Sequence, residues 1–244
     1  MGENMQSNNR IEYVFLDEQK RDLVLILPGG GYHFTSPREA MPVAKRILQA
    51  GMHAAIFWYR ETKHLYPMIK EEGIHILESI KRMPQVKHLF MCGFSAGGHY
   101  ALMLSIARPD LISKTVLAYP VVSSDPLIRH EGSFVNLLGD LSSPYIDEVS
   151  LEKQVHEKLN PMFIMHTADD QAVPVENTLR LVHALQVHNL SYELHIYPHG
   201  PHGLSLATED TSFEHMDPKV FAQNNNDVSG WFRLALNFLR REES

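Results

Sequence analysis

A serine flanked by glycines directly follows the apolar run at positions 89–92. The segment Gly93-Phe94-Ser95-Ala96-Gly97 has the pattern G-x-S-x-G, in which the serine stands at a sharp turn between a strand and a helix. The glycines remove side chains that would clash where the strand and the helix nearly touch. A serine hydroxyl exposed at such a turn can attack a carbonyl carbon, so the pattern predicts nucleophilic catalysis by Ser95.

A serine hydroxyl is a weak nucleophile and needs a histidine base that is oriented by a carboxylate. In proteins with this motif, the acid and then the histidine follow the serine along the chain. Asp169 and Asp170 close one apolar run, and His199 and His202 follow the last one. The residues alone leave both aspartates open, whereas Gly203 directly after His202 favours His202 as the base.

A glycine-rich loop after an early apolar run could supply the oxyanion hole. Gly29, Gly30 and Gly31 follow the apolar residues 23–27, and glycine lets backbone N–H groups approach a substrate closely. We expect Gly30 and Gly31 to act together with the backbone N–H of Ala96, the residue after the serine. Four residues flank this predicted site and are candidate substrate-binding residues: Tyr32, Phe94, Tyr119 and Val173.

Three histidines near the end of the chain raise the alternative of a metal site. His195, His199 and His202 do not share a helix, because prolines and glycines lie between them and His195 falls within a strand pattern. The single cysteine, Cys92, excludes an internal disulfide and a cysteine-based zinc site. We therefore expect neither a metal nor a cofactor.

Composition narrows the class of partner. The chain has 244 residues, 44% of them hydrophobic, and a formal net charge of −7. This charge argues against nucleic acid as a partner, and no window is apolar enough to span a membrane. The first ten residues are polar and lack the apolar run of a secretory signal. The expectation is a cytoplasmic protein with a small-molecule substrate, and the sequence leaves open whether it forms a homo-oligomer.

Short apolar runs alternate with helical patterns along the chain, which predicts a mostly parallel sheet with helices on both faces. Helices are expected over 66–83, 175–188 and 228–241 and directly after Ser95, and Ser36-Pro37-Arg38-Glu39 is typical of a capping box at another helix start. The expected strands are Ile11–Asp17, Leu23–Leu27, His53–Tyr59, His88–Cys92, Thr115–Val122, Met162–His166 and Tyr192–Tyr197.

One segment interrupts this alternation. Residues 123–160 form a connection too long for an ordinary loop, and such connections are usually functional covers or disordered. Its apolar residues Phe134, Leu137, Leu138 and Tyr145 could anchor it to the core. We interpret the chain as a single domain over residues 1–244, with an ordered insert at about 123–160 that forms a small cover over the site.

The three motifs together resemble those of the α/β-hydrolase fold, and within it the small esterases related to hormone-sensitive lipase and bacterial acetylesterases, including acetyl xylan esterases. The resemblance covers about residues 24–238. Gly93-Phe94-Ser95-Ala96-Gly97-Gly98-His99 is similar to the family's nucleophile elbow, and Gly200-Pro201-His202-Gly203 to its histidine loop. Asp170-Gln171-Ala172-Val173-Pro174 resembles its acid turn, and this resemblance selects Asp170 over Asp169. The family's oxyanion loop commonly begins with histidine, whereas this chain has Pro28 there.

The resemblance implies an α/β-hydrolase sheet of about seven to eight strands and a serine esterase for short acyl, acetyl-type esters, including acetylated sugars. Ser95 would attack the ester, His202 would move the proton, Asp170 would orient His202, and water would release the acyl group. Two alternatives have different expected features. A prolyl-oligopeptidase-like acyl-peptide hydrolase usually carries a propeller domain, and a non-catalytic binding protein on this fold would be expected to have lost part of the triad.

Overall fold

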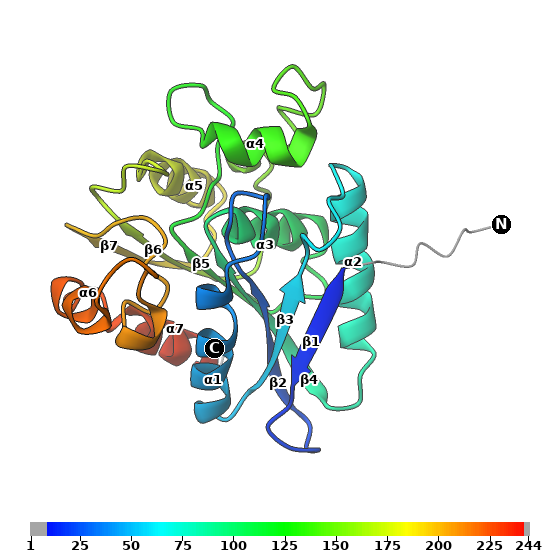
Figure 1. Cartoon of the computed structure of the whole chain (residues 1–244). Coiled ribbons are helices and arrows are strands. Elements are labelled where there is room, and N and C mark those ends of the chain that lie inside the picture. The colour runs from blue at the N-terminus through cyan, green and yellow to red at the C-terminus, as the bar shows by residue number, and fades with distance from the viewer. Residues whose placement is uncertain (1–8, 242–244) are drawn as a thin grey trace.

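The computed structural model describes residues 9–241, in which a seven-stranded sheet lies between two groups of helices (Figure 1). β1 runs antiparallel to β3, and every other neighbouring pair is parallel. The predicted mostly parallel sheet is therefore confirmed. The strands are β1 (Arg10–Val14), β2 (Arg21–Leu27), β3 (His53–Trp58), β4 (Val86–Phe94), β5 (Lys114–Ala118), β6 (Met162–Thr167) and β7 (Tyr192–Tyr197).

The strand order β1-β3-β2-β4-β5-β6-β7 determines where a ligand can bind. The chain leaves β2 for β3 on one side and later adds β4 on the other side, so the direction of strand addition reverses between β2 and β4. At such a switch point the loops after two neighbouring strands diverge and leave a crevice beyond the carboxyl ends. The glycine loop follows β2 and Ser95 follows β4, so these two predicted parts of the site meet at the switch point.

Alternate side chains of the central strands face opposite helix layers, as in strands that are buried on both faces. In β2, Leu23, Leu25 and Leu27 join the apolar cluster of α2, α3 and α5. Val24 and Ile26 pack on the other face with α1, α6 and α7. The helices are α1 (Met41–Gln49), α2 (Met68–Lys81), α3 (Ala96–Ala107), α4 (Glu131–Leu138), α5 (Glu176–Val187), α6 (Pro218–Asn224) and α7 (Trp231–Arg240).

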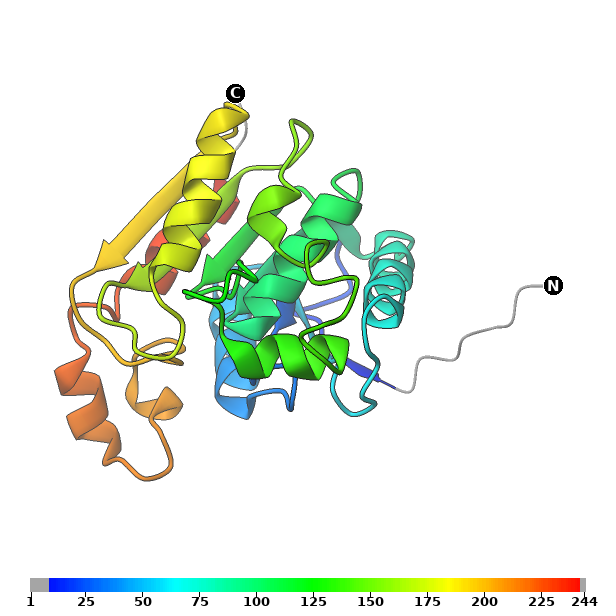
Figure 2. The same cartoon turned by 90° about the horizontal axis from the view of Figure 1, so that it is seen from above.

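Segment 123–160 lies beyond the carboxyl ends of the strands and contains α4, which Figure 2 shows in front of α3. Phe134 and Leu137 of α4 are buried in the same apolar cluster as α2 and α3. The Asn177 side chain fixes the start of the segment, because its Oδ1 accepts from the backbone N–H groups of Val122 and Ser123 at 2.9 and 3.0 Å. These contacts give the segment a fixed position over that end of the sheet.

The predicted capping box at Ser36 is wrong. Ser36 makes no side-chain cap, residues Pro37–Glu39 form only a short 3-10 turn, and the helix begins at Met41. Glu39 does not reach back to the Ser36 backbone, because its carboxylate is buried and accepts hydrogen bonds from Gly29 and Tyr119. The tertiary contacts of Glu39 therefore override the local pattern.

The strand expected over Thr115–Val122 is shorter than predicted and ends at Ala118. Tyr119 has a φ of +39°, which turns the chain out of the extended conformation, and Pro120 has no N–H to continue a ladder. The apolar run continues because these residues are buried, not because they are a strand. Within residues 9–241, no helix combines the length and apolar character that a bilayer span requires.

Candidate active site

Ser95 occupies a tight turn between β4 and α3. Its φ of +51° and ψ of −118° are strained for a residue with a Cβ, and such strain is common at functional sites. The turn is held by a hydrogen bond from the Ser95 N–H to the Ala118 carbonyl oxygen (3.0 Å) and by one from Val121 N–H to the Ser95 oxygen (3.2 Å). The serine of the predicted elbow is thus fixed at the end of the central strand.

Close backbone packing explains why Ser95 has glycine two residues before and two after it. A Cβ on Gly93 would stand 2.4 Å from the Gly97 carbonyl oxygen. A Cβ on Gly97 would stand 2.0 Å from the carbonyl oxygen of Leu27, at the end of β2. Both distances are far below van der Waals contact, so α3 can only approach β2 and β4 this closely when both positions are glycine.

The structure brings Ser95, His202 and Asp170 into one hydrogen-bonded row. The Ser95 Oγ lies 2.8 Å from His202 Nε2, and His202 Nδ1 lies 2.7 Å from Asp170 Oδ2. The Tyr119 ring packs edge-on against the His202 ring with centroids 5.1 Å apart. The three side chains come from the loops after β4, β6 and β7 and can act as nucleophile, base and orienting acid.

Asp170 is the more buried of the two neighbouring aspartates, and four hydrogen bonds hold it. Its Oδ1 accepts from the backbone N–H groups of Ala172 (2.9 Å) and Val173 (3.0 Å). Its Oδ2 faces His202 at 2.7 Å and the buried His166 at 3.3 Å. Burial opposes ionisation, but the hydrogen bonds from His166 and His202 and from the Val173 N–H outweigh it and hold the Asp170 pKa well below its usual range.

Asp169 and His199 form a separate pair on the surface. The Asp169 Oδ2 lies 3.0 Å from His199 Nδ1, and its Oδ1 accepts from the Gly200 N–H at 2.9 Å. The His199 side chain is 87% exposed to solvent. The aspartate pair that the sequence left open is therefore divided into an inner and an outer residue, each with its own histidine.

Three hydrogen bonds hold the glycine loop after β2, which comprises residues 29–31. Two of its carbonyl oxygens accept hydrogen bonds, and one of its N–H groups donates one. The Gly30 oxygen accepts from His33 N–H (2.9 Å), and the Gly31 oxygen accepts from Asn136 Nδ2 of α4 (2.9 Å). Gly29 is unavailable as an oxyanion donor, because its N–H donates to Glu39 Oε2 at 2.7 Å. Gly30 and Gly31 both have positive φ values, +130° and +62°, which fits the need for glycine there.

Two buried side chains brace this loop in place of a histidine at position 28. The Tyr59 hydroxyl donates to the Pro28 carbonyl oxygen at 2.6 Å. Glu39 links the loop to the triad: it accepts from Gly29 N–H, its Oε1 accepts from the Tyr119 hydroxyl at 2.7 Å, and the Tyr119 ring packs on His202. Burial raises the Glu39 pKa, and the hydrogen bonds from Tyr119 and Gly29 oppose that rise.

Glu39→Gln is expected to lower kcat about tenfold. If the amide oxygen accepts from Gly29 N–H, the amide NH2 must face the Tyr119 hydroxyl, whose own hydrogen then loses its buried acceptor. The free energy of unfolding should change by less than about 1 kcal/mol, since removing a buried carboxyl charge offsets the lost bond. Steady-state kinetics and urea unfolding of this variant and of the exposed control Glu18→Gln would measure both effects. An unchanged kcat would contradict a positioning role for Glu39.

The four candidate substrate-binding residues lie under the site and not around its opening. Tyr32, Phe94, Tyr119 and Val173 are at most 1% exposed in this structure, and their role in substrate binding stays a prediction. Tyr32 bonds to the buried His99 at 2.9 Å, and Phe94 packs on Trp231. Their burial follows from positions that the sequence could not reveal, on the inner side of the loops.

The three histidines considered as metal ligands have separate partners. His195 Nε2 lies 2.9 Å from Glu193 Oε1, and His199 Nδ1 lies 3.0 Å from Asp169 Oδ2. The His202 ring lies between Ser95 and Asp170 and bonds to both. Among residues 9–241, no group of three or more histidine, cysteine and acidic side chains is arranged to hold a metal ion.

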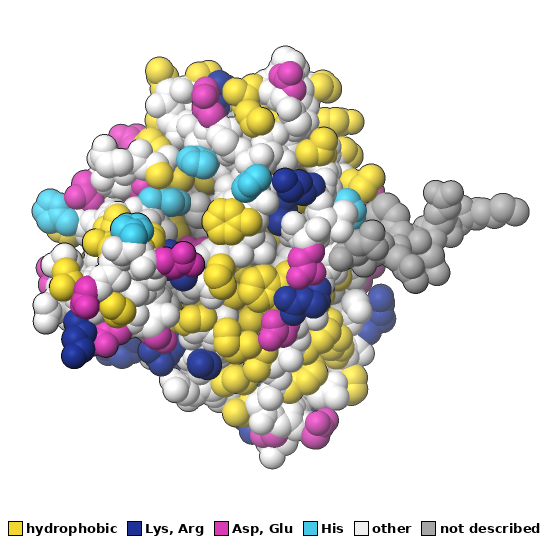
Figure 3. Space-filling model, in the orientation of Figure 1, with side chains coloured by type: hydrophobic (Ala, Val, Ile, Leu, Met, Phe, Trp, Pro, Cys, Tyr) yellow, Lys and Arg dark blue, Asp and Glu magenta, His cyan; other side chains and the backbone are white. Residues whose placement is uncertain are grey.

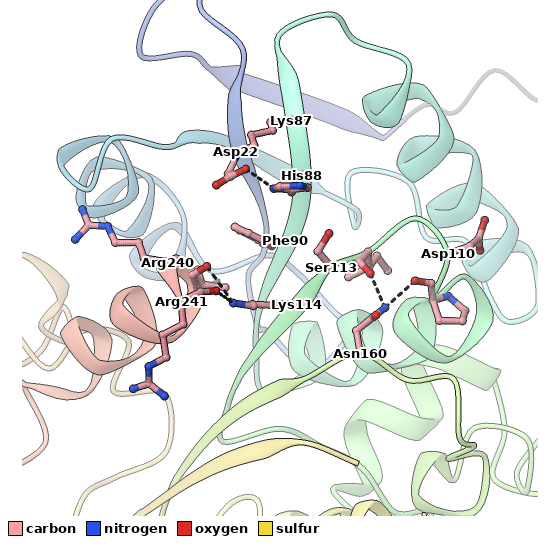
Figure 4. A pocket seen from close by; sticks show the side chains of 13 residues that line it. Asp22, Lys87, His88, Phe90, Asp110, Ser113, Lys114, Asn160, Arg240 and Arg241 are labelled. Carbon is pink, nitrogen blue, oxygen red and sulfur yellow. Dashed lines mark hydrogen bonds and ion pairs between the residues drawn. The ribbon is translucent and has the colours of Figure 1, made fainter. Parts of the chain in front are cut away.

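A hollow of about 650 Å3 lies at the opposite, amino-terminal end of the parallel strands (Figure 4). Its polar groups hold the fold together. Lys114 Nζ donates to the carbonyl oxygens of Phe238 and Leu239 at the end of α7 (3.1 and 3.4 Å), and Asp22 bonds to His88 at 2.8 Å. The lining also contains Ser113, but within residues 9–241 no hydrogen bond joins Ser113 to His88, so the hollow lacks a row like that of Ser95, His202 and Asp170.

Sequence reasoning missed Glu39, His166 and His130, which all approach the triad. In the sequence, Glu39 is part of the expected capping box, which the structure does not form. His166 lies in an expected strand, where a buried histidine attracts no attention. His130 is the N-cap of α4, and its ring borders Gly31 of the loop after β2. None of the three stands in a catalytic motif, so only the folded chain could reveal their place near Ser95 and His202.

Comparison with known proteins identifies a family match over more than half of the chain. The model of the prolyl oligopeptidase family matches residues 72–225, which include Ser95, Asp170 and His202. The endo-1,4-beta-xylanase B of Butyrivibrio fibrisolvens is 30% identical over 234 residues, and the acetylxylan esterase of Xylanibacter ruminicola is 27% identical over 220 residues. These alignments cover 83% and 84% of this chain but only 35% and 46% of the two curated relatives.

Solved structures resemble the chain over nearly its whole length. The acetyl ester-xyloside bifunctional hydrolase from Caldicellulosiruptor lactoaceticus has a TM-score of 0.74 at 29% identity, covering 90% of this chain and 88% of that one. The carboxylesterase Cest-2923 from Lactobacillus plantarum has a TM-score of 0.78 at 25% identity, covering 97% of both chains. An α/β hydrolase, MGS-M1 from a deep-sea metagenome library, has a TM-score of 0.74 at 27% identity, covering 96% and 97%.

Proposed function

The chain belongs to the prolyl oligopeptidase family within the α/β-hydrolase fold, and we propose that it hydrolyses carboxylic esters with Ser95, His202 and Asp170 as its catalytic triad. The observation that carries this proposal is the row of two short hydrogen bonds, 2.8 Å from Ser95 Oγ to His202 Nε2 and 2.7 Å from His202 Nδ1 to Asp170 Oδ2. A side-chain row of this kind activates a serine hydroxyl for attack on a carbonyl.

In the proposed reaction, Ser95 Oγ attacks the ester carbonyl carbon while His202 Nε2 accepts the hydroxyl proton. The tetrahedral intermediate collapses, the carbon–oxygen bond to the alcohol breaks, and His202 gives its proton to the leaving alcohol. Water then attacks the acyl-serine, again with His202 as base, and releases the carboxylic acid and free Ser95. Asp170 keeps the Nδ1 hydrogen in place and stabilises the imidazolium.

The negative oxygen of each tetrahedral intermediate requires donors that are already in position. We assign this role to the backbone N–H of Ala96, at the start of α3, and to the loop glycines Gly30 and Gly31. Ala96 is well suited, because the first N–H groups of a helix have no partner within it and the helix dipole is positive there. Gly29 is not included, since Glu39 uses its N–H.

The relatives favour an acyl ester as substrate. The similar proteins at 25–29% identity are an acetylxylan esterase, an acetyl ester-xyloside bifunctional hydrolase and a carboxylesterase. We therefore propose acetyl-type esters, including acetylated sugars, as the substrates of this chain. Segment 123–160 would act as a small cover, and polar residues such as Ser124, Asp125 and Asp140 on it suit a hydrophilic alcohol.

One substrate panel tests the proposal: 4-nitrophenyl esters, an acetylated xyloside and an aminoacyl anilide, each assayed with and without a serine-directed phosphonate. Ester cleavage that the phosphonate abolishes, with mass spectrometry placing the label on Ser95, is the expected result. Absence of hydrolysis on the whole panel would contradict it and favour a non-catalytic binding protein on this fold.

The family match favours a second candidate, cleavage of an acylated peptide, since the matched model describes prolyl oligopeptidases. The same triad serves both reactions, because each proceeds through an acyl-serine. The anilide arm of the panel separates them. Faster turnover of the anilide than of the acetate esters would make the chain a peptidase and leave the assignment of Ser95 unchanged.

Activity is expected to fall with increasing acyl length. Each methylene buried in an apolar trough contributes about 0.8 kcal/mol, so an enzyme for long acyl chains gains steeply with length. The cover over this site is small and rich in polar residues, so additional methylenes would remain in water. With 4-nitrophenyl esters from acetate to octanoate, kcat/KM should peak between acetate and butyrate. A profile that still rises at octanoate would refute the short-acyl proposal and leave the triad intact.

A further inference from the structure

Segment 123–160 brings His130 to the loop that follows β2. His130 is the N-cap of α4, and its Nδ1 accepts from the backbone N–H of Ser133 at 3.2 Å. Asn136 of the same helix donates to the Gly31 carbonyl oxygen at 2.9 Å, which fixes α4 to the loop. A Cβ on Gly31 would stand 3.7 Å from His130 Cε1, so the ring borders a residue that we assign to the oxyanion hole.

The contact with Ser133 determines which ring nitrogen of His130 carries hydrogen. A backbone N–H can only donate, so His130 Nδ1 must be the acceptor and cannot hold a hydrogen itself. The Ser133 hydroxyl, 2.8 Å from the same nitrogen, can donate to it as well. In the neutral ring the hydrogen is therefore on Nε2, and His130 presents an N–H donor from its far edge.

The surroundings of His130 favour its neutral form. Burial lowers the His130 pKa, and the nearby His202 lowers it further, whereas Asp170 opposes this with a smaller effect. Within residues 9–241, His130 Nε2 has no hydrogen-bond partner. It is not among the fully buried polar atoms that lack a partner, so this nitrogen is accessible to solvent. Figure 3 shows histidine side chains gathered on this face of the molecule, between α4 and α6.

We propose that His130 is a substrate-binding residue, whose Nε2–H donates a hydrogen bond to an oxygen in the alcohol part of the ester. This rests on the proposed function. An acetyl group has one polar atom, its carbonyl oxygen, and the oxyanion donors bind that atom. Any further acceptor must belong to the alcohol, so a donor at His130 selects alcohols with hydroxyl or ether oxygens, such as a monoacetylated sugar, over purely apolar alcohols.

Two substitutions separate this role from the capping role of His130. Asparagine places a carbonyl oxygen near the position of Nδ1 and is a good N-cap, but it does not reach the position of Nε2. Glutamine places its amide near the position of Nε2 and cannot cap α4 as well. Thus His130→Asn keeps the cap and loses the donor, whereas His130→Gln loses the cap and keeps a donor. The control is Glu131→Gln, whose side chain is 68% exposed on the same turn.

The assay compares kcat/KM for a monoacetylated methyl xyloside with that for phenyl acetate, whose alcohol carries no further acceptor. For His130→Asn, the xyloside value is expected to fall about tenfold, mainly through KM, as the loss of one hydrogen bond implies. The loss on phenyl acetate should be several times smaller. His130→Gln should retain more of the preference for xyloside at a lower melting temperature, and Glu131→Gln should match the wild type on both substrates.

Equal losses on the two substrates for His130→Asn, or no loss on the xyloside, would overturn the inference. A wild-type protein that cleaves phenyl acetate but not the xyloside would also overturn it, and the proposed esterase function would stand. A wild-type protein that cleaves neither acetate would instead overturn the proposed function, and the inference with it.

Discussion

Replacing Asp170 by asparagine is expected to lower kcat by about 10^4-fold, the size of effect that a wrong histidine tautomer produces in a serine triad. The two backbone N–H groups of Ala172 and Val173 that point at Oδ1 fix the orientation of the new amide. Its carbonyl oxygen must accept from them, so its NH2 group takes the place of Oδ2. There it donates to His202 Nδ1, which moves the ring hydrogen to Nε2 and leaves Ser95 without a base.

The neighbouring aspartate supplies a matched control. Asp169 pairs with His199 on the surface, and Asp169→Asn removes one exposed interaction of a kind that contributes little to stability. Its kcat should stay within about threefold of the wild type. Steady-state kinetics on 4-nitrophenyl acetate would compare the two variants, with circular dichroism to check the fold. A larger loss at Asp169 than at Asp170 would overturn the assignment of the triad acid.

Ser95→Ala is the second change with a very large expected effect, a fall in kcat of about 10^4-fold or more, because no other group can form the acyl-enzyme. Labelling by the phosphonate should disappear at the same time. Residual activity near the wild-type level, or a label that moves to another residue, would contradict Ser95 as the nucleophile.

Strain at this position predicts a difference in stability between two inactive variants. Alanine retains a Cβ at φ +51° and ψ −118°, whereas glycine adopts such angles without penalty. Ser95→Gly should therefore be as inactive as Ser95→Ala but more stable by about 1 kcal/mol in urea unfolding. Equal stability of the two variants would show that the turn stores no strain at Ser95.

Local patterns in the sequence predicted the sheet and the order of the triad. Continuous apolar runs indicate strands that are buried on both faces, and β2 has this pattern because Leu25 faces one helix layer and Val24 the other. The elbow was predictable because part of its requirement for glycine is local: a Cβ at position 93 would stand 2.4 Å from the carbonyl oxygen of Gly97, four residues later. Asp170 was selected by its spacing to Pro174 in a known motif, whereas no physical argument from the residues alone separated it from Asp169.

The tertiary structure decided what the rest of the site does. Glu39 lies in a local sequence typical of a helix cap, yet it braces the loop after β2, because Gly29 and Tyr119 approach it from segments 10 and 80 residues away. His130 follows no catalytic motif and reaches the loop after β2 only because α4 folds over the end of the sheet. Tyr32 and Phe94 flank the site in sequence but are buried beneath it. Sequence spacing constrains neighbours along the chain, whereas burial and the approach of distant segments depend on packing of the whole chain, which no local pattern encodes.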